Sequence, residues 1–254
     1  MKTATIAAAL VLGILVGIPG YAGYFDRNYL VEVPATAQPI ASRRQLAVIY
    51  FSGDVGYKAG MGGMIGSRIS ADGLPVVAVN SLAFFGTHKT VSQVTALTAV
   101  AMRQALAFGH ASQVILIGHS LGGDAMQAGL MDLPQDLRGK IRAVILIVPT
   151  KDLFLQISPA EMLDLGTPDS AVLPTLKRLD WVPLTCIHGA EEADSPCAQL
   201  SLPNARNVRL PGGHALHWDI DRVHREILRA IDQAAPKVTE VSESNNVRAM
   251  RRGA

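Results

Sequence analysis

The decapeptide LIGHSLGGDA at residues 116–125 places one serine where a hydroxyl could act as a nucleophile. Ser120 lies between Gly118 and Gly122, so it fits the G-x-S-x-G pattern of a sharp turn from a strand to a helix. Glycines are needed there because the chain approaches its neighbours closely on both sides of the serine. The run QVILI before the turn and the apolar segment after it would supply the strand and the helix. The alternative interpretation is a turn serine without a chemical role.

A serine nucleophile needs a general base, and the base needs an acid that orients it. In chains with this turn, the acid and then the histidine follow the serine. His214, in the glycine-rich segment LPGGH after the last predicted strand, is the preferred base, and His217 is its competitor. The two histidines could also bind a metal, but no acidic or thiol pattern beside them supports such a site.

The orienting acid is expected in the loop that follows the apolar run PLTCIHG. Glu192 is the first choice because it lies three residues beyond Gly189, and Asp194 is nearly as good. Asp152, after the preceding strand, is the third. Each of the three could instead be an exposed loop carboxylate.

Two backbone N–H groups must also face the oxyanion that forms during acyl transfer. The amide of Leu121, directly after the serine, is one expected donor. The other is the amide of Asp54 in the segment FSGDVG. A catalytic triad of this kind requires neither a metal nor a cofactor, and we expect none.

Short apolar runs alternate with helical patterns along the chain, which is typical of an α/β fold with a mostly parallel sheet flanked by helices. The expected strands are residues 46–52, 75–80, 113–119, 142–149, 183–189 and 206–211. The clearest helical pattern covers residues 91–109. Active groups of such sheets lie at the carboxyl ends of the strands. Residues 150–181 form a long connection, expected to carry short helices and to cover part of the site, with a lid that is small or absent.

Composition and charge indicate one globular domain. Hydrophobic residues make up 49% of the 254 residues and charged residues 17%. The net charge of +2 comes from the two ends, so the body is close to neutral and no nucleic-acid-binding face is expected. We expect a hydrolase domain at 46–235, a linker at 23–45 and a disordered basic tail at 236–254.

The first 22 residues have the layout of an export signal: an early lysine, an apolar run from Ala4 to Ile18, then Pro19 and small residues. Cleavage after Ala22 is expected. An uncleaved anchor is the alternative, because the run from Ala4 to Ala22 is just long enough to span a bilayer. Both interpretations place the body outside the cytoplasm.

The cysteine pair fits an exported protein, in which disulfides persist. Cys186 and Cys197 bracket the acid loop CIHGAEEADSPC, and we expect a bridge between them. Two free buried thiols are the alternative. A bridge would hold the orienting acid in place.

Four segments together resemble the VirJ/AcvB family of bacterial virulence proteins, which are exported α/β-hydrolases: YFSGDVGY, GHSLGGDA, CIHGAEEADSPC and LPGGH. The resemblance covers residues 46–232, and EEADSPC is its most specific part. The residues that fall on the family pattern are Asp54, Ser120, Asp124, Glu192, Asp194, Cys197 and His214. Val55 and Tyr57 depart from it, where the family has glycine and tryptophan, and HSLGG replaces YSFGA.

The resemblance implies a serine hydrolase with the α/β-hydrolase fold that removes lysine from lysyl-phosphatidylglycerol at the outer face of the inner membrane. The partner would then be an aminoacylated phospholipid, whose lysyl group carries two positive charges. Asp54 and Asp124 are candidate partners for these charges, or else turn and cap residues. The alternatives are a general carboxylesterase or lipase and a non-enzymatic periplasmic interaction protein. The oligomeric state is not predicted.

Overall fold

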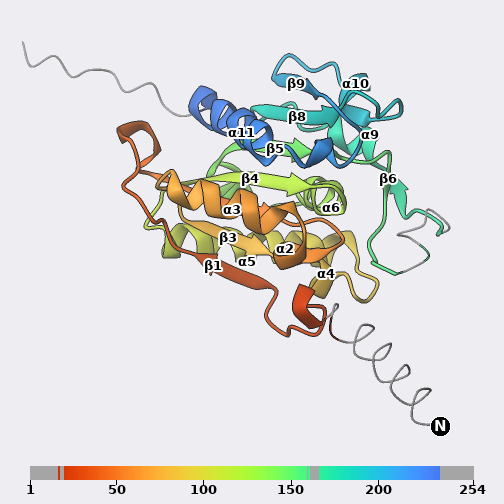
Figure 1. Cartoon of the computed structure of the whole chain (residues 1–254), viewed down its shortest axis with the longest axis horizontal. Helices are drawn as coiled ribbons and strands as arrows, with labels where there is room; N and C mark the ends of the chain where they lie inside the picture. Colours follow the sequence, from red (N-terminus) through yellow and green to blue (C-terminus); the bar gives the residue numbers. More distant parts are fainter. Residues whose placement is uncertain (1–16, 18–19, 159, 161–165, 235–254) are drawn as a thin grey trace, which may run out of the picture.

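The computed structural model describes residue 17, residues 20–158, residue 160 and residues 166–234. A seven-stranded sheet runs through its centre in the order β1-β3-β2-β4-β5-β8-β9 (Figure 1). These strands are β1 (Leu30–Val33), β2 (Leu46–Phe51), β3 (Val76–Val79), β4 (Gln113–His119), β5 (Ile141–Ile147), β8 (Leu184–Gly189) and β9 (Ala205–Leu210). All neighbouring pairs are parallel except β1 with β3. The predicted mostly parallel sheet is confirmed.

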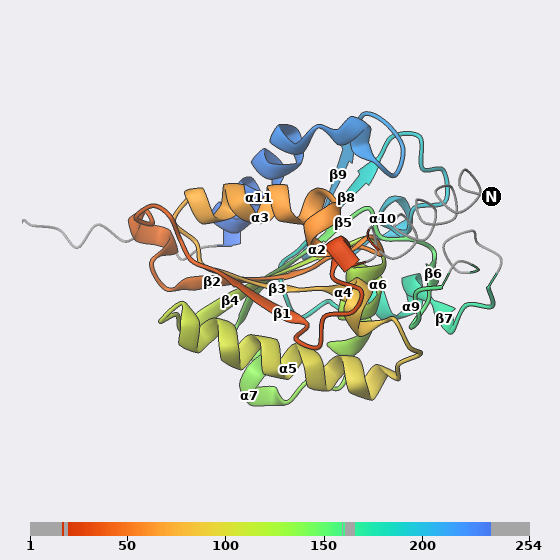
Figure 2. The same ribbon diagram turned by 60° about the horizontal axis from the view of Figure 1, so that its bottom comes forward.

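Helices cover both faces of the sheet, which explains why β2, β3 and β8 are buried at every residue. One face packs against α5 (Val91–Phe108), α6 (Leu121–Gly129), α7 (Gln135–Arg138) and α9 (Val172–Leu176). The other face packs against α2 (Gly56–Ala59), α3 (Met61–Ala71) and α11 (Ile220–Ala234). Figure 2 shows the two helical layers on opposite sides of the sheet. The shorter helices are α4 (Ser81–Phe84), α10 (Pro196–Gln199), η1 (Ala41–Arg43) and η2 (Leu216–Trp218).

The linker predicted at residues 23–45 is wrong, because this segment belongs to the folded domain. Leu30–Val33 form the edge strand β1, which pairs antiparallel with β3. Arg43 is buried and its guanidinium donates two hydrogen bonds of 2.8 Å to the carboxylate of Asp232 on α11. An edge strand needs only one buried face, and β1 has only one buried residue among its four, so its sequence shows little apolar pattern.

Two predictions fall on the ends of the chain. The tail at 236–254 lies outside the described residues, as does nearly all of the export signal or anchor at 1–22. None of the helices in the described part of the chain is long and apolar enough to cross a membrane.

The described residues of the connection 150–181 form one short helix, as expected, and two short strands that were not expected. Strand β6 (Asp152–Leu153) pairs antiparallel with β7 (Ser170–Ala171), and α9 follows. Figure 1 places β6 beyond the carboxyl ends of the parallel strands, next to α6. This connection therefore covers one side of the region where the catalytic candidates lie.

The predicted disulfide is confirmed: Cys186 in β8 is bonded to Cys197 in α10. The two Cα atoms lie 5.5 Å apart, and both side chains are fully buried. The bridge fixes the base of the loop that carries Glu192 and Asp194.

Candidate active site

Ser120 occupies the turn between β4 and α6 in a backbone conformation that residues other than glycine rarely adopt, with φ 52° and ψ −132°. The turn is held by a hydrogen bond from the Ser120 N–H to the Ile147 carbonyl (2.9 Å). A Cβ atom on Gly118 would lie 2.4 Å from the Cα of Gly123, and one on Gly122 would lie 2.1 Å from the Ser52 carbonyl oxygen. Both glycines are therefore required by close backbone approach.

Gly122→Ala is expected to lower the free energy of unfolding by at least about 3 kcal/mol, because its Cβ would overlap the backbone of the chain after β2 and no rotamer relieves that overlap. Urea unfolding measures the difference. Gly139→Ala is the matched control, since the nearest atom to its added Cβ is 3.7 Å away. A Gly122→Ala protein as stable as that control would contradict the close packing of the turn.

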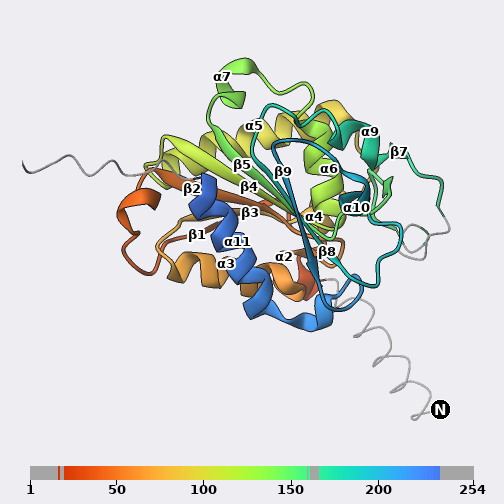
Figure 3. The ribbon, with the colours of Figure 1, turned by 90° about the horizontal axis from the view of Figure 1, so that it is seen from above.

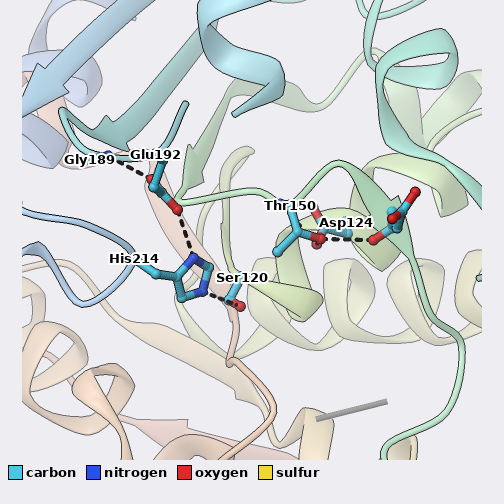
Figure 4. A network of polar contacts seen from close by, with 7 residues as sticks. Ser120, Asp124, Thr150, Gly189, Glu192 and His214 are labelled. Atoms are coloured by element: carbon cyan, nitrogen blue, oxygen red, sulfur yellow. Dashed lines mark hydrogen bonds and ion pairs between the residues drawn. The ribbon is translucent and has the colours of Figure 1, made fainter. Parts of the chain in front are cut away.

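Three side chains from the carboxyl ends of three strands meet in one hydrogen-bonded row (Figure 4). The Oγ of Ser120, after β4, lies 2.9 Å from Nε2 of His214, after β9. Nδ1 of His214 lies 2.8 Å from Oε1 of Glu192, after β8. The other carboxylate oxygen of Glu192 accepts a hydrogen bond of 2.7 Å from the N–H of Gly189. The row has the geometry of a serine-histidine-acid triad.

The competing residues lie apart from this row. The Asp194 side chain is 70% exposed, and its carboxylate is 3.5 Å from Nζ of Lys151. His217 is exposed and lies 4.0 Å from a carboxylate oxygen of Glu191. Within the described part of the chain, Asp152 makes no hydrogen bond to the three residues of the row; its carbonyl oxygen accepts a hydrogen bond from the hydroxyl of Thr150. The structure thus brings together Ser120, His214 and Glu192.

The glycines of LPGGH bring His214 close to the acid loop. A Cβ atom on Gly189 would lie 2.5 Å from the carbonyl oxygens of both Gly212 and Gly213. Gly212 has a φ of +96°, which favours glycine. The loop after β9 therefore packs directly against the end of β8, and the imidazole can reach both Glu192 and Ser120.

The two predicted oxyanion donors belong to segments that border the nucleophile. The Leu121 N–H is at the first position of α6, and the loop with Asp54 follows β2. That loop is close to the serine, since a Cβ on Gly53 would lie 3.6 Å from the Cβ of Ser120. The hydrogen bonds of the described residues include none from the backbone N–H of Leu121 or Asp54. Both groups are free to donate to a substrate oxygen.

A cavity of about 460 Å³ opens beside the triad, a size typical of small-molecule sites. Asp54, Asp152 and Asp194 line it together with the triad and Lys151, and Phe154 and Ile157 from the connection after β5 add apolar wall. No cluster of three or more metal-ligating side chains occurs in the described part of the chain.

The sequence of residues 45–235 matches the family model described as bacterial virulence protein (VirJ). The chain belongs to this family. No curated protein matches it.

Solved structures similar to this VirJ-family chain share its fold at low sequence identity. The esterase domain of a Rhodothermus marinus protein is 17% identical with a TM-score of 0.53, and the match covers 80% of this chain and 97% of that one. MenH from S. aureus is 14% identical with a TM-score of 0.55 (82% and 99% covered). Est1E from Butyrivibrio proteoclasticus, with ferulic acid bound, is 17% identical with a TM-score of 0.54 (80% and 95% covered). The VirJ-family chain has the α/β-hydrolase fold.

Two titratable groups near the nucleophile of this VirJ-family protein are buried, and the sequence did not predict their burial. His119 directly precedes Ser120. Burial, and to a smaller extent the neighbouring His214, lowers the pKa of His119 from 6.5 to about 4. His119 is therefore neutral near pH 7, and His214 is the imidazole available to the serine.

The lowered pKa of His119 makes stability depend on pH. Between pH 6.5 and 4 the unfolded chain binds a proton at His119 and the folded chain does not, so stability falls as pH falls. We expect this residue to account for a loss of about 2 kcal/mol in the free energy of unfolding between pH 7 and pH 4.5. Urea unfolding of the wild type and of His119→Gln at both pH values measures this contribution. The fall in the free energy of unfolding between about pH 7 and pH 4.5 should be smaller in His119→Gln by about that amount. An equal loss in both proteins would contradict a neutral His119.

Asp124, in the first turn of α6, is buried and bonded to Thr150, which follows β5. Oδ1 accepts a hydrogen bond of 3.1 Å from the Thr150 N–H, and Oδ2 lies 2.8 Å from Thr150 Oγ1. Burial raises the pKa of Asp124 well above its usual value, although the hydrogen bonds from Thr150 oppose the shift. Thr150 Oγ1 is also 2.8 Å from the Asp152 carbonyl oxygen, which can only accept. Because the hydroxyl has one proton, a protonated Asp124 completes the network.

Asp124→Asn is expected to change the free energy of unfolding by less than about 1 kcal/mol at pH 8, because an amide can accept from the Thr150 N–H and donate to its hydroxyl. Thr150→Val should cost about 1–3 kcal/mol, since it leaves a buried carboxyl without one partner. Chemical unfolding of the two variants tests this. An Asp124→Asn protein that loses much more stability at pH 8 than at pH 5 would show that the carboxyl is charged.

Proposed function

We propose that this VirJ-family protein is an exported serine hydrolase that cleaves the ester bond between an amino acid and a phospholipid, as in lysyl-phosphatidylglycerol. The observation that carries the proposal is the acidic cavity beside Ser120. Asp54, Asp152 and Asp194 supply carboxylates to its wall, and Lys151 is the only lysine or arginine there among the described residues. Such a wall favours a substrate with positive charge.

A lysyl ester matches this wall because its acyl group carries an α-ammonium and an ε-ammonium next to the scissile bond. Asp54 and Asp152 are the proposed partners of these charges. Asp124 also lines the cavity, but its raised pKa and its bonds to Thr150 make it a hydrogen-bonding group and not a counter-ion. Asp194 is exposed and paired with Lys151, so it contributes to the entrance.

The triad geometry fits a two-step ester hydrolysis. Ser120 Oγ attacks the aminoacyl carbonyl and its proton passes to Nε2 of His214, while Glu192 stabilises the imidazolium. The Leu121 and Asp54 N–H groups would donate to the oxyanion. The glycerol oxygen of the lipid leaves with the proton from His214. Water, activated by the same imidazole, then hydrolyses the acyl-serine and releases the amino acid.

The proposed location outside the cytoplasm is supported by two features. The buried Cys186–Cys197 bridge is of the kind that persists in oxidising compartments. The first 22 residues have the composition of an export signal or anchor. An enzyme held at the outer face of the inner membrane would meet aminoacylated lipid there.

The deciding experiment measures lysine release from lysyl-phosphatidylglycerol in mixed phospholipid vesicles by the full chain, with Ser120→Ala as the inactive control. Nitrophenyl esters of lysine and of norleucine are compared in parallel, because norleucine lacks only the side-chain ammonium. We expect lysine release by the wild type alone, and a preference of about tenfold or more for the lysine ester.

Each other outcome selects a different function. Hydrolysis of nitrophenyl butyrate without lipid turnover or preference for lysine would indicate a general carboxylesterase. Inactivity on all substrates by a folded protein would support a periplasmic interaction protein, with Ser120 a strained turn residue.

A further inference from the structure

Large apolar side chains exposed on this molecule are concentrated on one edge. Eight are exposed among the described residues, and six of these form what we call the apolar rim: Tyr21, Tyr24, Phe25, Val55, Met64 and Trp218. The other two, Ile40 and Val100, lie elsewhere, next to η1 and on α5.

The first half of the rim is held together by contacts of the N-terminal segment. The Ala22 carbonyl accepts a hydrogen bond from the side chain of Asn80 (3.3 Å). It also lies 2.8 Å from the place of a Cβ on Gly56, the residue after Val55. The rings of Tyr24 and Phe25 meet edge to face at 5.2 Å. The three aromatic residues thus lie beside the start of α2.

The second half of the rim follows α3 to the start of α11. A methyl group of Val55 is 2.7 Å from the place of a Cβ on Gly60, which caps α3, and Met64 is one turn along that helix. Arg68, the next turn, pairs with Asp221 at 2.8 Å, three residues after Trp218. Figure 3 shows α3 and α11 lying side by side. The six residues therefore lie on neighbouring elements, from the N-terminal segment over α2 and α3 to the turn before α11.

This edge borders the active site. Val55 follows Asp54, which lines the cavity, and Trp218 comes four residues after His214, which also lines it. Leu216, His217 and Trp218 all have positive φ, between 47° and 56°. Such a run in residues other than glycine is strained, and it presents an indole that is 55% exposed.

We propose that the apolar rim rests on the surface of a lipid bilayer and thereby sets the mouth of the cavity against the membrane. Continuity with the N-terminal segment, retained as the uncleaved anchor, supports a bilayer as the occupant: no charged residue occurs between Lys2 and Asp26, and the rim begins at Tyr21, three residues after the apolar run that ends at Ile18. Tyrosine and tryptophan suit the interfacial zone because each ring has an apolar body and a polar group that can reach water, and phenylalanine adds apolar surface that can enter the acyl boundary. The inference rests on the proposed function in that it explains how a lipid-borne ester reaches Ser120.

Tryptophan fluorescence can test the contact directly, because the chain has only two tryptophans. In the full-length Trp181→Phe protein, Trp218 is the sole reporter. The protein is reconstituted in phosphatidylcholine–phosphatidylglycerol vesicles with or without brominated phosphatidylcholine. We expect a shift of Trp218 emission to shorter wavelength and quenching of about twofold or more by the brominated lipid.

A matched control carries a tryptophan of similar exposure on another face. In Trp181→Phe/Trp218→Phe/Val100→Trp the reporter is on α5, at a position 51% exposed, on the sheet face opposite α3 and α11. The brominated lipid should leave it unquenched. Equal quenching of the two reporters would overturn the proposal, and so would the absence of quenching at Trp218. The second result would indicate that the rim binds a protein partner and not a bilayer.

Paired substitutions test the functional consequence. Phe25→Ser/Met64→Ser should lower the rate on vesicle-borne aminoacyl lipid by about tenfold and leave soluble nitrophenyl ester hydrolysis unchanged. Ile40→Ser/Val100→Ser should affect neither substrate. Trp218 quenching without any lipid turnover would keep the rim and reject the proposed substrate. Lipid turnover without quenching, or turnover that the Phe25/Met64 pair does not reduce, would reject the rim and keep the substrate.

Discussion

Ser120→Ala is expected to lower kcat on any ester that this protein hydrolyses by about 10⁵- to 10⁶-fold, and His214→Ala by nearly as much. The reason is geometric: the 2.9 Å contact between Ser120 Oγ and His214 Nε2 makes the two groups one proton-transfer unit. Once either member is removed, the other has no partner to act on. The double variant should therefore be no slower than the slower single variant.

Steady-state rates of the three variants with nitrophenyl butyrate measure this coupling. His217→Ala is the control, because His217 is exposed and lies away from the serine; its kcat should stay within about threefold of wild type. Circular dichroism of each variant verifies the fold. Losses that multiply in the double variant would mean that the two residues act independently and that the contact is not catalytic.

The residues of the site that could be predicted from the sequence are those fixed by local backbone demands. Gly118 and Gly122 are needed wherever a chain turns sharply from a buried strand into a helix, so the pentapeptide and its apolar flanks predict the position of Ser120. The same holds for the glycines before His214, which allow two loops to touch. Buried parallel strands produce unbroken apolar runs, and the predicted strands agree with the observed ones within a few residues.

Features that depend on contacts distant in sequence could not be predicted. β1 has one buried face and four residues, so its pairing with β3 leaves little trace in the pattern. The contact of Asp124 with Thr150 joins the first turn of a helix to the end of the next strand, and only the assembled sheet brings them together. The raised pKa of Asp124 follows from that burial. A sequence shows a carboxyl, but its protonation is decided by the environment.

The choice between Glu192 and Asp194 belongs to this second group. Both carboxyls lie in one loop, two residues apart, and no periodicity tells which of them points inward. In the structure the Glu192 side chain is largely buried against His214 and the end of β8, whereas Asp194 points to solvent near Lys151. The disulfide fixes the ends of the loop but not the direction of each side chain.

Glu192→Gln is accordingly expected to lower kcat by about 10³- to 10⁴-fold with little change in KM, whereas Asp194→Asn should stay within about threefold of wild type on an uncharged ester. Both oxygens of Glu192 accept hydrogen bonds, one from the Gly189 N–H and one from His214 Nδ1. A glutamine has a single acceptor oxygen. If that oxygen stays with Gly189, the amide N–H faces Nδ1 and favours the tautomer with the proton on Nε2, which cannot take the proton of Ser120.

Rates on nitrophenyl butyrate decide between the two carboxyls, and the lysine ester adds a second comparison. Asp194 lines the entrance of the acidic cavity, so Asp194→Asn should raise KM for the lysine ester more than for the butyrate. Glu192→Gln should lower kcat equally on both, because orientation of the imidazole is needed for every substrate. A large kcat loss in Asp194→Asn with a nearly normal Glu192→Gln would reverse the assignment. The loop would then have to turn its exposed carboxylate inward before catalysis.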